Sequence, residues 1–143
     1  MLISKMFFKK KENKLEDNYL IKIASLLIHA AKIDEHFTKE EEVIIKNTLI
    51  QLGSSVDSID QLIEKAKSME ENSNQILDFT REVKNLKESE KIKIVEALWR
   101  IIYSNKDADM YETNLMRRLA GLLYIDNQVM GDIKEKIKKE KSS

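Results

Sequence analysis

Apolar residues recur at intervals of three and four along most of the chain, as they do on one face of an α-helix. No segment alternates apolar and polar residues with the period of two that indicates a β-strand. The pattern predicts an all-α fold of about seven helices, within residues 17–34, 38–53, 56–70, 73–86, 89–103, 109–123 and 126–137. Proline is absent and there are only three glycines, so little interrupts these helices.

Residues suited to capping stand at the predicted helix ends. Thr38 and Glu41 have the spacing of a capping box, in which the Thr38 hydroxyl and the Glu41 carboxylate each accept the other residue's backbone N–H. Gly53 follows the same helix as a C-terminal stop. The other expected N-terminal caps are Asp17, Asn72 or Ser73, Asp109 and Asp126.

A chain of 143 residues is long enough for one domain with a buried core. We expect a single compact helical domain over residues 15–137, preceded by an N-terminal segment, residues 1–14, and followed by a disordered charged tail, residues 138–143. The N-terminal segment is expected to be a short helix or tail that packs its apolar residues on the domain. Its alternative role is docking to a membrane surface through residues 1–11, with the lysines at 9–11 facing lipid headgroups.

The composition argues against several classes of function. Basic and acidic residues balance at 25 each, so the chain lacks the basic excess of a nucleic-acid-binding protein. There is no cysteine, hence no disulfide, thiolate metal site or cysteine nucleophile. No apolar run reaches the roughly 18 to 20 residues of a membrane span, and the N-terminus lacks the order of a secretory signal. We expect a cytoplasmic protein, with association to the inner membrane as the alternative.

Two stretches of the chain share one layout: an apolar helix end, a short polar corner and a capped helix. They read LLIHAAKIDEHFTKEEEVIIKNTLIQLG and ALWRIIYSNKDADMYETNLMRRLAGLLY, and they align at an offset of 71 residues. The alignment places Asp34 on Asn105, Phe37 on Ala108, Thr38 on Asp109 and Glu41 on Glu112. We expect two related helical hairpins that pack around a pseudo-two-fold axis.

The order and spacing of residues in these stretches resemble the TerB family, the tellurite-resistance TerB-like helical proteins of bacteria. HAAKIDEHFTKEEE resembles the family's alanine-rich helix end, Ala-Asp-Gly corner, cap and Glu. The second stretch carries the family's later pattern as Leu98-Trp99, Tyr111-Glu112, Asn114-Leu115 and Arg117-Arg118. The resemblance covers residues 15–135 and implies an all-helical, stress- or tellurite-resistance-associated protein.

Both corners depart from the family's Ala-Asp-Gly motif. The first reads Ile33-Asp34-Glu35 and lacks the glycine. The second reads Ser104-Asn105-Lys106 and lacks both the aspartate and the glycine. An acidic site that needs matched aspartates therefore depends on Asp107 for its charge on the second side.

Four acidic residues of the two corners are the candidate metal ligands: Asp34, Glu41, Asp107 and Glu112. If the hairpins meet, these carboxylates converge, and a hard divalent cation such as Ca²⁺ or Mg²⁺ prefers several oxygen ligands. The competing interpretation is that acids at these positions only cap helices and complement the helix dipole.

Other side chains favour structural roles. His29 and His36 are seven residues apart, which is not the spacing of a helical zinc site. Trp99, Tyr103 and Tyr111 lie among apolar residues at helical spacing and are expected in the core rather than in a ligand cage.

No set of nucleophile, base and orienting residue is present, so we expect no enzymatic activity. The favoured function is binding of a protein partner or a divalent cation through the acidic corners. The alternative is a membrane-surface adaptor, or a module linked to co-chaperones, that docks through residues 1–11. The sequence leaves the oligomeric state open.

Overall fold

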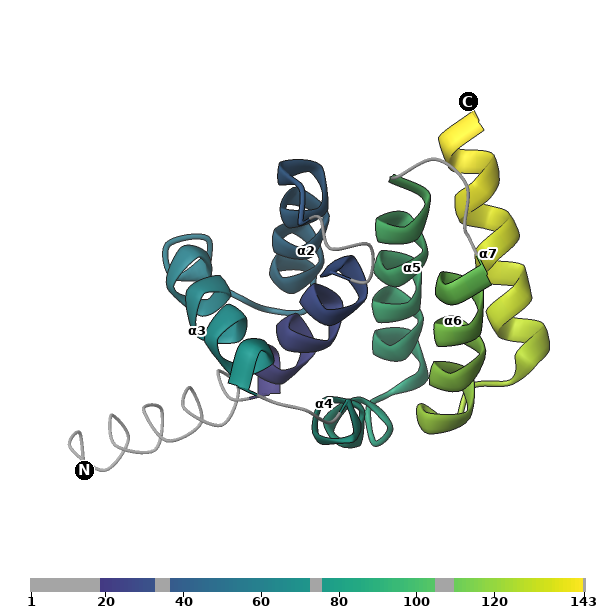
Figure 1. Ribbon diagram of the computed structural model, residues 1–143, viewed down its shortest axis with the longest axis horizontal. Coiled ribbons are helices and arrows are strands. Elements are labelled where there is room, and N and C mark those ends of the chain that lie inside the picture. Colours follow the sequence, from purple (N-terminus) through teal and green to yellow (C-terminus); the bar gives the residue numbers. More distant parts are fainter. Residues whose placement is uncertain (1–18, 33–36, 73–75, 105–109, 143) are drawn as a thin grey trace, which may run out of the picture.

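Every regular element in the described part of the chain is a helix, as the sequence predicts (Figure 1). A computed structural model describes residues 19–32, 37–72, 76–104 and 110–142. The first helix spans residues 19–31. The later helices are α2 (Lys39–Gln51), α3 (Ile59–Asn72), α4 (Leu77–Val83), α5 (Glu88–Ser104), α6 (Met110–Leu122) and α7 (Asn127–Ser142).

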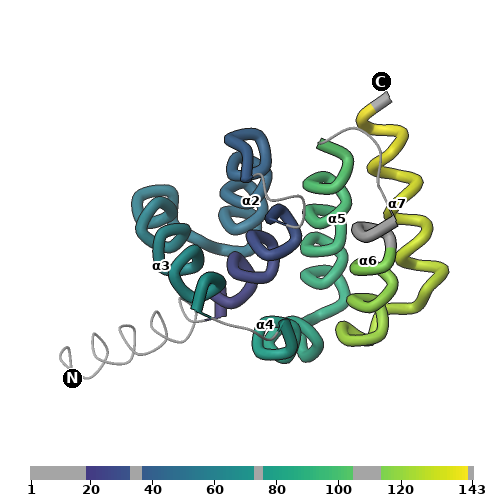
Figure 2. The backbone as a smooth tube through the Cα atoms, viewed as in Figure 1, coloured from purple at the N-terminus to yellow at the C-terminus, as the bar shows by residue number. Residues whose placement is uncertain are grey.

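The first helix and α5 provide much of the core. All side chains from Leu20 to Ala31 are buried except those of Lys22 and His29. α5 is also buried over most of its circumference, because it packs against both α2 and α7 (Figure 2). A helix that is apolar on nearly all sides has to be enclosed by other helices, and α2, α3, α6 and α7 each bury only one face.

The helices repeat at an offset of 71 residues. α6 begins and ends 71 residues after α2, and both helices have 13 residues. At the same offset α5 overlaps the first helix and α7 overlaps α3. Buried apolar positions match as well, including Ile23 with Ile94, Leu27 with Leu98, Ile45 with Met116, Ile59 with Met130, Leu62 with Ile133 and Ala66 with Ile137. The predicted pair of hairpins is thus part of a longer repeat of two three-helix units, residues 19–72 and 88–142.

The two hairpins also end in the same way. After α2, the N–H of Gly53 donates to the carbonyl of Ile50 and the N–H of Ser54 to that of Leu49, which is a Schellman motif. After α6, the N–H groups of Tyr124 and Ile125 make the same bonds 71 residues later. Both C′ residues have positive φ, 112° for Gly53 and 56° for Tyr124. The predicted stop at Gly53 is confirmed, whereas Tyr124 holds this conformation without a glycine.

Replacing Tyr124 by glycine is expected to raise the free energy of unfolding by about 0.5–1 kcal/mol, because an L side chain is strained in the left-handed region. The ring is 72% exposed, so little packing is lost. Lys84 Nζ lies 5.7 Å from the ring centroid, and this exposed cation–π contact contributes little to stability. Urea denaturation followed by circular dichroism measures the change. The reciprocal variant Gly53→Tyr is expected to lose stability; a loss in Tyr124→Gly would contradict the strain argument.

Contacts at the start of the first helix join the two units. The Tyr19 hydroxyl donates to Glu90 Oε2 at 2.9 Å, and these two residues occupy equivalent positions in the repeat. A contact between equivalent positions is what a pseudo-two-fold axis produces. Burial, together with the hydrogen bond to Glu90, raises the pKa of the Tyr19 hydroxyl. On the next turn Lys22 Nζ pairs with Glu82 Oε1 of α4 at 2.8 Å, so α4, which links the units, is fixed to the first one.

Two helix ends differ from the prediction. α4 begins at Leu77 with Ile76 as its N-cap and no side-chain cap, so the expected cap at Asn72 or Ser73 is wrong; Asn72 instead ends α3. α7 continues to Ser142, although a disordered tail is expected from residue 138. The lysines and glutamates after Ile137 have high helix propensity and extend the helix. Asp126 caps α7 as predicted, because its Oδ1 accepts the N–H of Gln128 at 2.9 Å.

Candidate functional site

The capping box at the start of α2 is confirmed. Glu41 N–H donates to Thr38 Oγ1 at 3.1 Å, and Thr38 N–H donates to Glu41 Oε1 at 2.9 Å. Glu41 is 0% exposed, which is unusual for a carboxylate. Its burial is compensated by this backbone hydrogen bond and by the positive end of the α2 dipole. The N-terminus of α2 therefore holds a buried acid directly after the first corner.

A groove of about 190 Å³ lies between the start of α2, the last turn of α5 and the last turns of α7. Ile44, Tyr103 and Ile137 supply apolar side chains to it, one from each helix. The full lining is Glu40, Ile44, Arg100, Tyr103, Ser104, Ile137, Glu140 and Lys141. Glu40 follows the first corner closely, and Ser104 immediately precedes the second. The described flanks of both corners therefore line the same groove.

Ion pairs fix α5 to α7 beside this groove. Arg100 Nη2 lies 3.4 Å from Glu96 Oε2 and 3.3 Å from Glu140 Oε2. Lys136 Nζ lies 3.3 Å from Glu96 Oε1. Glu96 is mostly buried, with 16% of its side chain exposed, so these contacts are less screened than ordinary surface pairs. They position the charged groups on the groove's α7 side.

The structure places only part of the predicted metal site. Asp34 and Asp107 lie outside the described residues, as does the side chain of Glu112, whose backbone belongs to α6. Glu41 is the one candidate whose side chain is described, and it is part of the capping box. Within residues 19–32, 37–72, 76–104 and 114–141, no group of three His, Cys, Asp or Glu side chains is placed to hold a metal ion.

The aromatic residues of α5 have the predicted core role. Trp99 and Tyr103 are 3% and 7% exposed, and their rings stack with centroids 6.0 Å apart. Lys134 Nζ lies 5.4 Å from the Trp99 ring centroid. The Trp99 Nε1–H is buried and has no hydrogen-bond partner among the described residues. Tyr103 is a core residue that also lines the groove. Its helical spacing in the sequence predicts only the core role.

His29 is a surface residue, as expected. Its Nδ1 lies 3.4 Å from Glu70 Oε1, and Lys32 Nζ donates to Glu70 Oε2 at 2.7 Å. The hydrogen bond to Glu70 raises the pKa of Lys32. These contacts fix the first helix to α3, so the histidine belongs to a structural ion-pair cluster. His36 lies outside the described residues.

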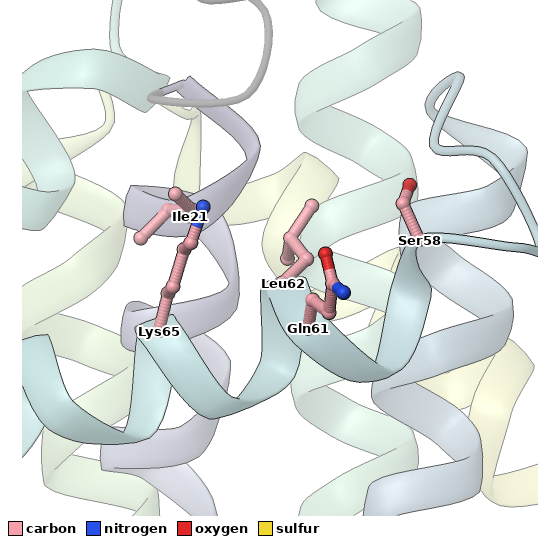
Figure 3. Close-up of a pocket in the computed structure, with 5 residues that line it drawn as sticks. All are labelled: Ile21, Ser58, Gln61, Leu62 and Lys65. Carbon is pink, nitrogen blue, oxygen red and sulfur yellow. The ribbon is translucent and has the colours of Figure 1, made fainter.

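A second hollow, between the first helix and the start of α3, is too small for a substrate. Figure 3 shows Ile21 of the first helix facing Gln61, Leu62 and Lys65 of α3, with Ser58 just before that helix. Its volume is about 50 Å³, enough for a few water molecules and far below the roughly 300 Å³ of a small ligand site. Lys65 and Gln61 are exposed on its rim.

The described helices give no candidate for a membrane span: none combines the length and the apolar character that a crossing requires. Residues 1–11, the segment proposed for membrane-surface docking, lie outside the described part of the chain.

The sequence was also compared with models of known protein families. The model of the family described as tellurite resistance protein TerB matches residues 20–135. The chain belongs to the TerB family. The match runs from the first helix into α7, so both three-helix units and both corners lie within the TerB region. Searches of curated proteins and of solved structures found no match.

Proposed function

We propose that this TerB-family protein acts by binding rather than by catalysis, and that its acidic corners bind a divalent cation, Ca²⁺ or Mg²⁺. Membership of the family described as tellurite resistance protein TerB supports a role for this binding in tellurite or stress resistance. The ligands we propose are the carboxylates of Asp34, Asp107 and Glu112, with Glu41 beside them.

The observation that carries this proposal is that the described flanks of the two corners line one groove. Glu40 at the start of α2 and Ser104 at the end of α5 line the same groove, although 64 residues separate them in the chain. Because each lies within a few residues of a corner, we infer that acids of both corners can reach one cation. Convergence of carboxylates from distant segments is what a hard cation requires.

Glu41 supports the site in a second way. Its buried carboxylate accepts the backbone N–H of Thr38, which fixes the chain where the first corner enters α2. A rigid support lowers the entropy lost when a ligand binds. Glu41 therefore acts as a positioning residue next to the corner, and its hydrogen bond explains its burial without a metal.

The test is an NMR titration of the ¹⁵N-labelled protein with Ca²⁺ and, separately, Mg²⁺. We expect saturable shifts at residues 33–42 and 104–113, and we expect Asp34→Asn with Asp107→Asn to abolish them. The matched control, Asp57→Asn with Asp78→Asn, removes two exposed acids from other parts of the surface and is expected to bind as the wild type does. Spectra unchanged up to millimolar cation would contradict the cation site.

A protein partner at the same groove is a second candidate. The apolar side chains of Ile44, Tyr103 and Ile137, surrounded by charged residues, resemble the apolar centre and polar rim of protein interfaces. A partner that binds here protects this groove's amides from hydrogen exchange without any added cation.

A further inference from the structure

The charges of this neutral protein are divided between its two ends. The segment from α2 to α3, residues 39–72, has eight acidic and four basic residues. The segment from α6 to α7, residues 110–142, has seven basic and five acidic residues. A chain with zero net charge therefore contains one segment with an excess of acidic residues and one with an excess of basic residues.

The outermost helices of the two segments, α3 and α7, lie at opposite ends of the molecule. In Figure 1 the longest axis is horizontal, with α3 at one end and α7 at the other. At the α3 end the exposed charged residues are Asp57, just before the helix, and Asp60, Glu64, Lys65 and Glu71 within it, so acids outnumber bases there. At the other end α6 exposes Arg117 and Arg118. α7 exposes Lys136, Lys138, Lys139 and Lys141 together with Asp132, Glu135 and Glu140, so bases outnumber acids there. Each end thus presents charges that complement those of the other.

We propose that these ends bind one another between copies of the chain, so that the acidic α3 end of one molecule docks on the basic α6–α7 end of the next. The contact is head-to-tail, so an open assembly keeps one free acidic end and one free basic end. A net charge of zero favours it, because no overall repulsion opposes the approach of a second copy.

The expected association is weak and sensitive to salt. Individual exposed ion pairs contribute little, and some acids at the α3 end already have partners in the same molecule, such as Asp60 with Lys46 at 2.8 Å and Glu64 with Lys67 at 3.3 Å. The attraction therefore comes from the summed field of each end, which is screened beyond about 10 Å at 0.1 M salt.

Sedimentation velocity of the purified full chain tests this. At about 20 mM salt the sedimentation coefficient is expected to rise with protein concentration, and at about 300 mM the rise is expected to disappear. Glu64→Lys with Glu71→Lys, or Lys139→Glu with Lys141→Glu, is expected to abolish the rise. Adding Asp57→Lys to the first pair and Lys138→Glu to the second, and combining the two sets, changes residues 39–72 from −4 to +2 and residues 110–142 from +2 to −4. This variant exchanges the charges of the two ends and is expected to restore the rise.

The control separates complementarity from net charge. Arg81→Glu with Lys87→Glu changes two exposed cations in or beside α4, between the two ends. Added to Glu64→Lys with Glu71→Lys, it also returns the net charge to zero, but the ends no longer match, so the protein is expected to stay monomeric. A wild type that is monomeric at low salt overturns the proposal, as does restoration by this control. In the latter case net charge alone governs association.

Discussion

Leu98→Ala is expected to lower the free energy of unfolding by about 3–4 kcal/mol, and Leu27→Ala by a similar amount. Both side chains are 0% exposed, and they occupy equivalent positions in the two three-helix units. Each lies midway along a helix that is buried on most sides, so the surrounding helices cannot easily close the cavity left by the missing atoms. Urea denaturation followed by circular dichroism at 222 nm gives both values.

Leu77→Ala is the matched control, because Leu77 is 42% exposed at the start of α4 and its loss is expected to cost less than about 1 kcal/mol. One cooperative transition is expected in every variant, since Tyr19, Glu90 and α4 connect the units. Separate transitions, or a large loss in only one of the two leucine variants, would show that the units are not equivalent in packing.

The helices were predictable because each has a local signal. Ile59, Leu62, Ile63 and Ala66 have helical spacing in the sequence and are all buried in α3. The Thr38–Glu41 spacing located the start of α2, and Gly53 its end. These signals depend on residues a few positions apart, which is the range over which backbone hydrogen bonds and caps act.

Where the local signal was absent, the prediction was incomplete. Nothing near Tyr124 distinguishes it from a surface tyrosine, yet it has the left-handed conformation that Gly53 has in the first unit. The clue was the repeat itself, because an offset of 71 carries Gly53 onto Tyr124. The groove had no such clue, since it depends on how α2, α5 and α7 pack and on ion pairs such as Arg100 with Glu140, 40 residues apart.

The candidate metal site was harder for a related reason. A cap and a hard-cation ligand use the same residue types, because a carboxylate oxygen can either accept a backbone N–H at a helix start or coordinate a cation. Spacing alone could not separate the two roles for Glu41. The structure assigns it the cap, and it also shows that the flanks of the two corners share a groove, which the sequence did not reveal. The cation role remains a prediction for Asp34, Asp107 and Glu112.

Glu41→Ala is expected to lower the free energy of unfolding by about 2–3 kcal/mol. Removing the carboxylate leaves the Thr38 N–H without its acceptor, which costs about 1–3 kcal/mol where the group is shielded from water. It also leaves a small cavity, since Glu41 is 0% exposed. Glu41→Gln keeps an acceptor oxygen but loses the charge that complements the helix dipole, so its expected loss is only about 1 kcal/mol. Chemical denaturation measures both.

Glu40→Ala is the control for this prediction, because Glu40 lies in the same first turn but is exposed, and a loss below about 0.5 kcal/mol is expected. The three variants, measured with and without cation, distinguish a capping role of Glu41 from a role as a metal ligand. If the cap is the main role of Glu41, the loss on Glu41→Ala is the same in chelator and in excess Mg²⁺. If Glu41 is itself a metal ligand, the loss grows with cation concentration, because only the wild type gains binding energy in the folded state. Asp34→Asn with Asp107→Asn then has the opposite pattern: near wild-type stability in chelator, and no stabilisation when cation is added.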